Sequence, residues 1–162
     1  MARLPSLPTI VRRTAPAPTI LLLVVVLVAG CAKLVENAPV ATPLDFPGIA
    51  GQLARRGIAV DKIASGDAGC QDAELARTAI RFAGSGLDQA TPVTLYVYIF
   101  RDRAAYDRRR QSVDACARSY VSDPLQLGSV DAPPFVVMGR GPWAPRFAAA
   151  LRSAMTEAAA LP

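Results

Sequence analysis

The chain has 162 residues, of which 52% are hydrophobic, and it carries a formal net charge of +5. It contains no histidine, which excludes the usual general base at neutral pH, histidine-dependent nucleophilic triads and most zinc sites. This length suits one modest domain with a short additional segment.

A short apolar run lies near the N-terminus, behind two arginines. Arg12 and Arg13 precede branched apolar residues over 19–28, and the run closes with Ala-Gly and Cys31. About 12 apolar residues are too few for a membrane-spanning helix, which needs ~20, and they fit the core of a signal peptide.

The order of charge, apolar run, small pair and cysteine resembles the lipobox of bacterial lipoproteins. The resemblance implies that diacylglycerol is added to the Cys31 sulfur, that the chain is cut before Cys31 and that the new amino group is acylated, for example with palmitate. An ordinary secretory signal, or an uncleaved anchor, with an incidental cysteine is the alternative.

The lipobox would divide the chain into three parts. Residues 1–30 would be the signal peptide, residues 31–43 a lipidated tether with two prolines, and residues 44–162 a single small domain. In the alternative, part of the tether packs on the domain. We expect membrane lipid as a partner through Cys31, with the domain on the extracytoplasmic side of the cell membrane or outer membrane.

Cleavage before Cys31 would also change the charge of the chain. Three arginines leave with the signal, so the basic residues fall from 18 to 15 while the acidic residues stay at 13, which gives a net charge of +2. The basicity of the whole chain is therefore no argument for a nucleic-acid partner, and we expect none.

Two cysteines remain after lipidation, Cys70 and Cys116. In an exported domain such a pair indicates a disulfide. A loop of about 47 residues closed in this way contributes ~4 kcal/mol in the chain-entropy model. Two unrelated buried thiols are the alternative.

The first half of the domain is expected to contain a helix and three strands. A helix over 46–56 is predicted from Asp45 as N-cap and from Gly57 after its end, and a strand follows over 58–64. Residues 75–83 fit a helix by composition and a half-buried strand by alternation. We favour a hairpin of 75–83 with 92–101, because the second segment is apolar on both faces and belongs inside a sheet.

The second half is expected to hold a long helix over 103–121, capped by Asp102 and stopped near Pro124. Residues 125–132 are predicted to be a loop. Residues 133–139 are predicted to be a short strand. Its prolines suggest either that they mark the start of the strand or that the strand lies at an edge of the sheet. A last helix follows Pro142, with an apolar stripe that suits core packing.

These elements predict the order α-β-β-β-α-β-α in an α+β fold. A single, mostly antiparallel sheet of about four strands would carry helices mainly on one face. If the strands on either side of the long helix are parallel, they form a right-handed crossover. Four short segments resemble small bacterial envelope lipoproteins of uncharacterised role, and the resemblance implies no activity: Leu53–Gly57, Val93–Phe100, Pro133–Phe135 and Gly139-Arg140.

Few residues suggest chemistry. Asp67, Asp72 and Glu74 would suit a hard cation such as calcium, but their spacing matches no known metal loop and solvated loop acids are favoured. The glycines around Ser85 and Arg140 indicate turns rather than phosphate loops. We expect no catalytic residue, metal or cofactor.

Arginines are densest on the predicted long helix. Arg108, Arg109 and Arg110 would suit contact with anionic lipid head groups or acidic cell-wall polymers, although a solvent-facing helix side is favoured. Trp143 and Phe147 would line a ligand groove or cover the edge of the core, and core cover is favoured.

The sequence therefore predicts a lipid-anchored, exported and non-enzymatic protein whose domain binds an envelope protein or a cell-wall component. A small-molecule or ion-binding lipoprotein is the second hypothesis. A hydrolase that uses carboxylates is the third.

Overall fold

A computed structural model describes residues 46–160. The predicted signal peptide, Cys31, the tether and the Asp45 cap lie outside the described residues. Within residues 46–160, no helix is both long enough and apolar enough to cross a membrane.

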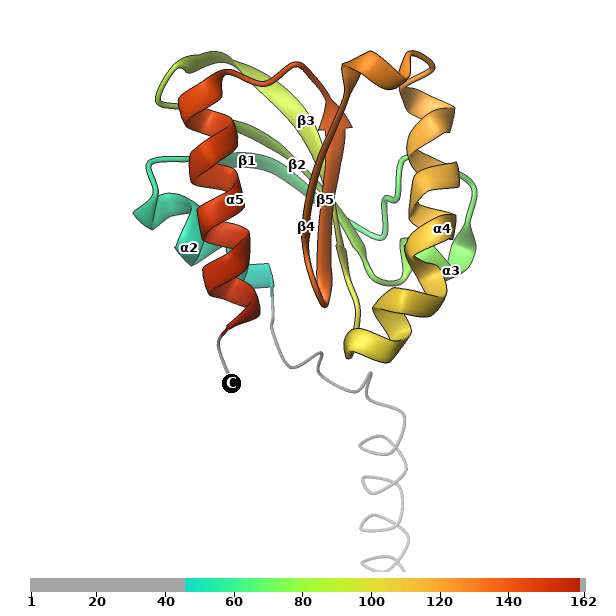
Figure 1. The fold of residues 1–162 in the computed structure, drawn as a ribbon. Coiled ribbons are helices and arrows are strands. Elements are labelled where there is room, and N and C mark those ends of the chain that lie inside the picture. The colour runs from blue at the N-terminus through green and yellow to red at the C-terminus, as the bar shows by residue number, and fades with distance from the viewer. Residues whose placement is uncertain (1–45, 161–162) are drawn as a thin grey trace, which may run out of the picture. The chain divides into compact units, whose positions relative to one another are not determined.

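One antiparallel sheet organises the domain (Figure 1), which confirms the α+β class. It has five strands, one more than about four, in the order β1-β2-β3-β5-β4. The strands are β1 (Ala59–Ser65), β2 (Ala79–Gly86), β3 (Gln89–Ile99), β4 (Leu127–Ala132) and β5 (Phe135–Arg140). The helices are α2 (Phe46–Arg55), α3 (Ala73–Ala76), α4 (Arg103–Tyr120) and α5 (Pro145–Ala159), with a 3-10 turn η1 (Pro124–Gln126).

The helices cover both faces of the sheet, which corrects the expectation that they pack mainly on one face (Figure 1). Strand β3 gives the reason, because its successive side chains point to opposite faces. Leu95 and Val97 join the core beneath α2 and α5, whereas Tyr98 and Phe100 join the core beneath α3 and α4. A strand that is apolar on both sides needs a helical cover on each.

Strand β4 was missed, because the sequence predicts a loop over 125–132. It pairs with β5 from Leu127↔Arg140 to Ala132↔Phe135. Its six residues include glycine and aspartate, which strands disfavour, and a serine, which is not a strong strand former. As a result β5 is an inner strand rather than an edge strand, and its two prolines precede it in the turn. Since β3 and β4 are each antiparallel to β5, they run parallel to one another and α4 connects them.

The favoured hairpin is confirmed, and both readings of 75–83 are partly right. Residues Ala73–Ala76 form α3, whose first turn is capped by the side chain of Asp72. Strand β2 then pairs with β3 in a register that includes Phe82↔Leu95 and shifts between Gly84 and Gly86. The strands continue through most of the predicted loop 84–91 and turn at Leu87, which has φ 55°.

The disulfide between Cys70 and Cys116 is present, with 5.4 Å between the Cα atoms. It joins the loop after β1 to the C-terminal half of α4. The loop therefore stays close to the face of the sheet that α4 covers.

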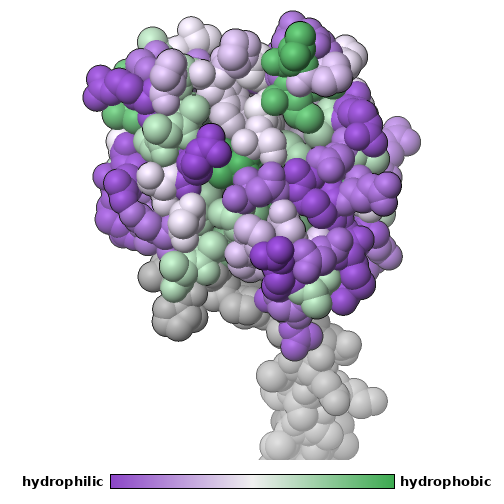
Figure 2. Space-filling model, in the orientation of Figure 1, coloured by the Kyte–Doolittle hydropathy of each residue, from purple (hydrophilic) through white to green (hydrophobic). Residues whose placement is uncertain are grey.

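The surface in Figure 2 is mainly hydrophilic. Hydrophobic residues gather at the end of the molecule where η1 lies in Figure 1. Leu125 of η1 is 91% exposed, more than any other large hydrophobic residue in the described part.

Candidate functional site

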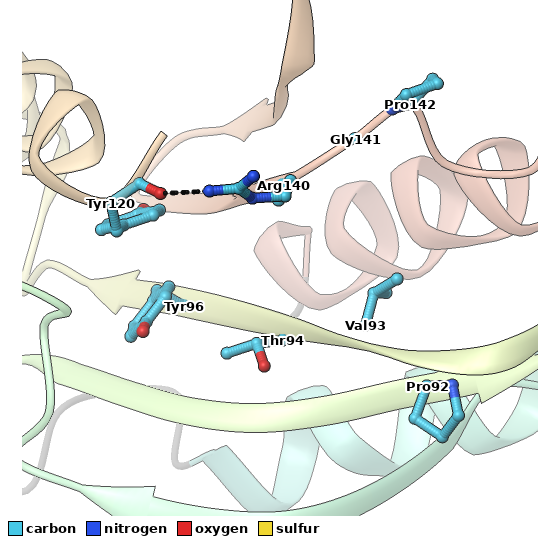
Figure 3. Close-up of a pocket in the computed structure, with 8 residues that line it drawn as sticks. All are labelled: Pro92, Val93, Thr94, Tyr96, Tyr120, Arg140, Gly141 and Pro142. Atoms are coloured by element: carbon cyan, nitrogen blue, oxygen red, sulfur yellow. Dashed lines mark hydrogen bonds between the residues drawn. The ribbon is translucent and has the colours of Figure 1, made fainter. Parts of the chain in front are cut away.

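A pocket of about 480 Å³ opens where α4 ends and leaves one face of the sheet uncovered (Figure 3). Strand β3, the last residue of α4 and the end of β5 supply its walls. The lining residues are Pro92, Val93, Thr94, Tyr96, Tyr120, Arg140, Gly141 and Pro142.

The pocket lies in a fork between β3 and the chain that follows β5. Pairing of these strands stops at Leu95↔Gly139, whereas β3 extends back to Gln89. At the next position of β5, the Arg140 carbonyl accepts a hydrogen bond from Trp143 Nε1 at 3.0 Å. Pro142 has no N–H to offer to a ladder. The strands therefore separate and leave the fork open.

Trp143 is held tightly in this arrangement. Its ring lies against Gly128 of β4, where an added Cβ would come within 2.5 Å of Trp143 Cζ2. It also packs against the core beneath α2 and α5, in which Phe147 is fully buried. The prediction of core cover is thus confirmed for both aromatic residues.

Two tyrosines form the aromatic wall. The ring centroids of Tyr96 and Tyr120 are 4.6 Å apart, with 34° between the ring planes. Gly69 lies beside them with φ +76°, and an added Cβ there would come within 2.8 Å of both rings. Only glycine fits this close approach in a left-handed backbone conformation.

The loop that carries Gly69 is fixed from several sides. The Asp67 carboxylate accepts hydrogen bonds from Gly69 N–H at 2.9 Å and from Arg81 Nε at 2.6 Å. The next residue, Cys70, is bonded to α4 through the disulfide. The aromatic wall is therefore formed before any ligand arrives.

The tyrosine hydroxyls nearby are not bases. Tyr98, behind the wall, donates to the Ala68 carbonyl at 2.8 Å, and burial raises its pKa to about 12. Burial also raises the pKa of Tyr120. The Tyr120 hydroxyl lies near Tyr98, but it forms no hydrogen bond of normal geometry with any described residue. Both phenols are neutral at physiological pH.

Arg140 supplies the charge of the pocket. One guanidinium nitrogen, Nη2, donates to the Tyr120 carbonyl at 3.1 Å, at the end of α4 (Figure 3). The negative end of the helix favours this cation. Among the described residues no carboxylate forms a salt bridge with Arg140, and no lining residue is acidic. The pocket therefore favours an anionic group.

The predicted arginine cluster is not one open surface, because Arg109 pairs with α3. It contacts the carboxylates of Asp72 at 3.1 Å and Glu74 at 2.8 Å. Arg108 is exposed on the surface of α4. Asp67, Asp72 and Glu74 do not gather around a common point, and no group of three or more metal-ligand side chains occurs in residues 46–160.

Arg110 joins α4 to the sheet. Its Nε donates to Asp131 of β4 at 2.6 Å, and its Nη1 pairs with Asp114. Burial raises the pKa of Asp131, but hydrogen bonds from Arg110 and Tyr106 outweigh this effect and lower it overall. Arg110 therefore has a structural contact that sequence reasoning did not find, because its partner is distant in the chain.

Sequence reasoning placed no ligand at Tyr96 or Tyr120, and it set aside a phosphate at Arg140 in favour of a turn. These residues come from three elements and share no local motif. The alternation of Thr94 and Tyr96 on β3 and the two glycines beside Arg140 were the available signals. A comparison with protein-family models finds no match to this chain, and no curated protein or solved structure matches it significantly.

Proposed function

We propose that this chain is a lipid-anchored, exported binding protein whose domain holds an envelope component in the pocket of Tyr96, Tyr120 and Arg140. The observation that carries the proposal is the Arg140 guanidinium, which lies at a preformed concave site without a described acidic partner. A hollow with aromatic walls and one orienting charge is typical of ligand sites.

The chemistry of the pocket favours binding over catalysis. Its lining offers one cation, two aromatic faces and the Thr94 hydroxyl, with no carboxylate or thiol beside them. A hydrolytic site needs a nucleophile within reach of a base. The raised pKa of Tyr120 makes it unsuitable as that base.

The anchor is the other half of the proposal. Each buried acyl methylene contributes ~0.8 kcal/mol, so two or three chains on Cys31 would fix the protein permanently at the membrane. Mass spectrometry of protein from native membranes tests this directly. We expect Cys31 as the first residue with added hydrocarbon mass, and an uncut, unlipidated precursor for Cys31→Ser. Normal processing of that variant would contradict the anchor.

Site-specific crosslinking in intact cells tests the pocket. A photoreactive residue at Thr94, inside the pocket, is compared with one at Thr156, which is exposed on α5. We expect a covalent adduct with envelope material from position 94 only, reduced when Arg140→Gln is added. Equal adducts from both positions, or none from position 94, would contradict a ligand site here.

A further inference from the structure

The pocket contains an open strand edge in addition to its charge. The N–H of Ile99 bonds to Thr78 on the β2 side, at 2.9 Å, and the N–H of Phe100 bonds to Pro134 on the β5 side, at 3.1 Å. Since successive residues of a strand direct their backbone groups to opposite edges, the N–H of Thr94 faces the β5 side, as does the Pro92 carbonyl.

These backbone groups lie beyond the last β3–β5 pair, Leu95↔Gly139. The Arg140 carbonyl, which a longer ladder would use opposite Thr94, bonds to the indole of Trp143 instead. The fork thus exposes a short length of strand edge inside the pocket. An extended peptide backbone is the chemical group that matches such an edge.

Arg140 stands on the opposite wall from this edge (Figure 3). Only its Nη2 bonds to another described residue, which leaves the other guanidinium donors without a partner among the described residues. The planar guanidinium matches a carboxylate with two parallel hydrogen bonds. An open strand edge with an arginine beside it favours a peptide whose C-terminal carboxylate lies at the arginine.

We infer that the pocket binds the C-terminal end of an extended peptide. The peptide backbone pairs with β3 at Thr94, its terminal carboxylate lies on Arg140, and its last side chain packs against Tyr96. This inference rests on the proposed function, because it names the ligand of the same pocket. An amidated end has no charge for Arg140 and binds more weakly.

The fluorescence of Trp143 provides the measurement. Trp143 is the single tryptophan of the chain, and its indole donates a hydrogen bond to the Arg140 carbonyl. Full-length protein in detergent micelles is titrated with acetyl-Ala-Thr-Val-Ala as the free acid and as the amide, and isothermal calorimetry repeats each titration. The amide also controls for partition into micelles. We expect the acid to bind at least ~10-fold more tightly, with a preference that weakens in salt.

Two further peptides test the strand pairing. Each is the free acid with one backbone nitrogen methylated, at the second or at the third residue. Because only alternate N–H groups face β3, one methylated peptide should lose ~5-fold or more in affinity while the other binds like the parent. Equal affinities of both with the parent would overturn the pairing.

Protein variants identify the charge. Arg140→Gln should abolish the preference for acid over amide, and Arg140→Lys should keep part of it. Arg152→Gln, at an exposed arginine of α5, should change nothing. Melting curves confirm that each variant is folded.

The outcomes separate this inference from the proposed function. Equal binding of acid and amide would overturn carboxylate recognition while leaving a peptide-binding pocket. If no peptide binds but crosslinking at Thr94 persists, the ligand class is wrong and the pocket function stands. Loss of the Thr94 adduct would contradict the proposed function itself. Tight binding of acetyl-alanine alone would show a free small acid as the ligand and overturn the peptide.

Discussion

The carboxylate of Asp88 accepts a hydrogen bond from the backbone N–H of Phe147, at 2.9 Å, across 59 residues of chain. It accepts a second bond from Arg146 N–H, also at 2.9 Å. Helix α5 has no side-chain cap of its own, because Ala144 occupies its N-cap position. The β2–β3 turn therefore supplies the cap that the helix sequence lacks.

The Asp88 contact predicts a loss of stability for Asp88→Ala, with a smaller loss for Asp88→Asn, whose single amide oxygen is a weaker acceptor. Desolvation raises the pKa of Asp88, but backbone hydrogen bonds, chiefly from Arg146 and Phe147, and the charge of Arg146 outweigh it and lower the pKa overall. Because the folded pKa is the lower one, the stabilisation is present above the unfolded value of ~3.9 and disappears as the pH falls through the folded pKa.

Urea unfolding at pH 7 and at about pH 2.5 measures this effect. We expect wild type and Asp88→Ala to differ at neutral pH and to converge in acid. If wild type and Asp88→Ala differ in free energy of unfolding by the same amount at both pH values, the contact does not depend on the carboxylate charge. Asp61→Ala, at an exposed position of β1, serves as the control.

Gly69 allows a matched test of the aromatic wall. Gly69→Ala combines a positive φ with overlap against Tyr96 and Tyr120, whereas Gly66→Ala has a similar φ of +81° and no atom within 4 Å of the added Cβ. We expect Gly66→Ala to cost about 1 kcal/mol and Gly69→Ala to cost ~1–3 kcal/mol more. Urea unfolding measures both losses of stability. Equal losses would show that Tyr96 and Tyr120 move aside without an energetic cost.

The two buried tyrosine hydroxyls should respond in opposite ways to removal. Tyr98→Phe loses the bond to Ala68 and should destabilise the domain by about 1–2 kcal/mol. Tyr120→Phe removes a buried hydroxyl without a geometric partner in the described residues, so it should be neutral or slightly stabilising. A loss of similar size for Tyr120→Phe would indicate a strong Tyr98–Tyr120 bond.

Alkaline unfolding provides a second test of Tyr98. Burial raises its folded pKa to about 12, so the stability due to the neutral phenol is complete below the unfolded value of ~10 and is lost as the pH rises to about 12. Wild type should therefore lose stability more steeply over this interval than Tyr98→Phe. Parallel pH profiles for the two proteins would contradict the assignment.

The fold was predictable where local pattern and packing agree. Strand β3 alternates apolar residues on both faces, and the sequence placed it correctly inside a sheet. The same residues imply a helical layer on each face of the sheet, but the sequence pattern predicted helices mainly on one face. Strand β4 carries Gly128, Ser129 and Asp131, and only its position beside β5 makes it a strand. Tertiary contact outweighed local propensity there.

The site was less predictable because its residues meet only in three dimensions. Tyr96, Tyr120 and Arg140 lie on β3, α4 and β5. Arg109 and Arg110 suggested contact with an anionic partner only because their acidic partners Asp72 and Asp131 are far away in the chain. The disulfide was predicted because compartment and residue count constrain it without geometry.

The disulfide itself allows a last prediction that links stability to the pocket. Removing it with Cys70→Ser and Cys116→Ser together should lower the free energy of unfolding by up to ~4 kcal/mol, since the unfolded chain regains the freedom of a long loop. The loss should also loosen Gly69, which lies next to Cys70 and beside both wall tyrosines. We therefore expect weaker peptide binding by the double serine variant under conditions where it remains folded. Urea unfolding measures the loss of stability, and calorimetry measures the loss of affinity. Unchanged affinity in the folded variant would show that the bonds of Asp67 alone position the wall.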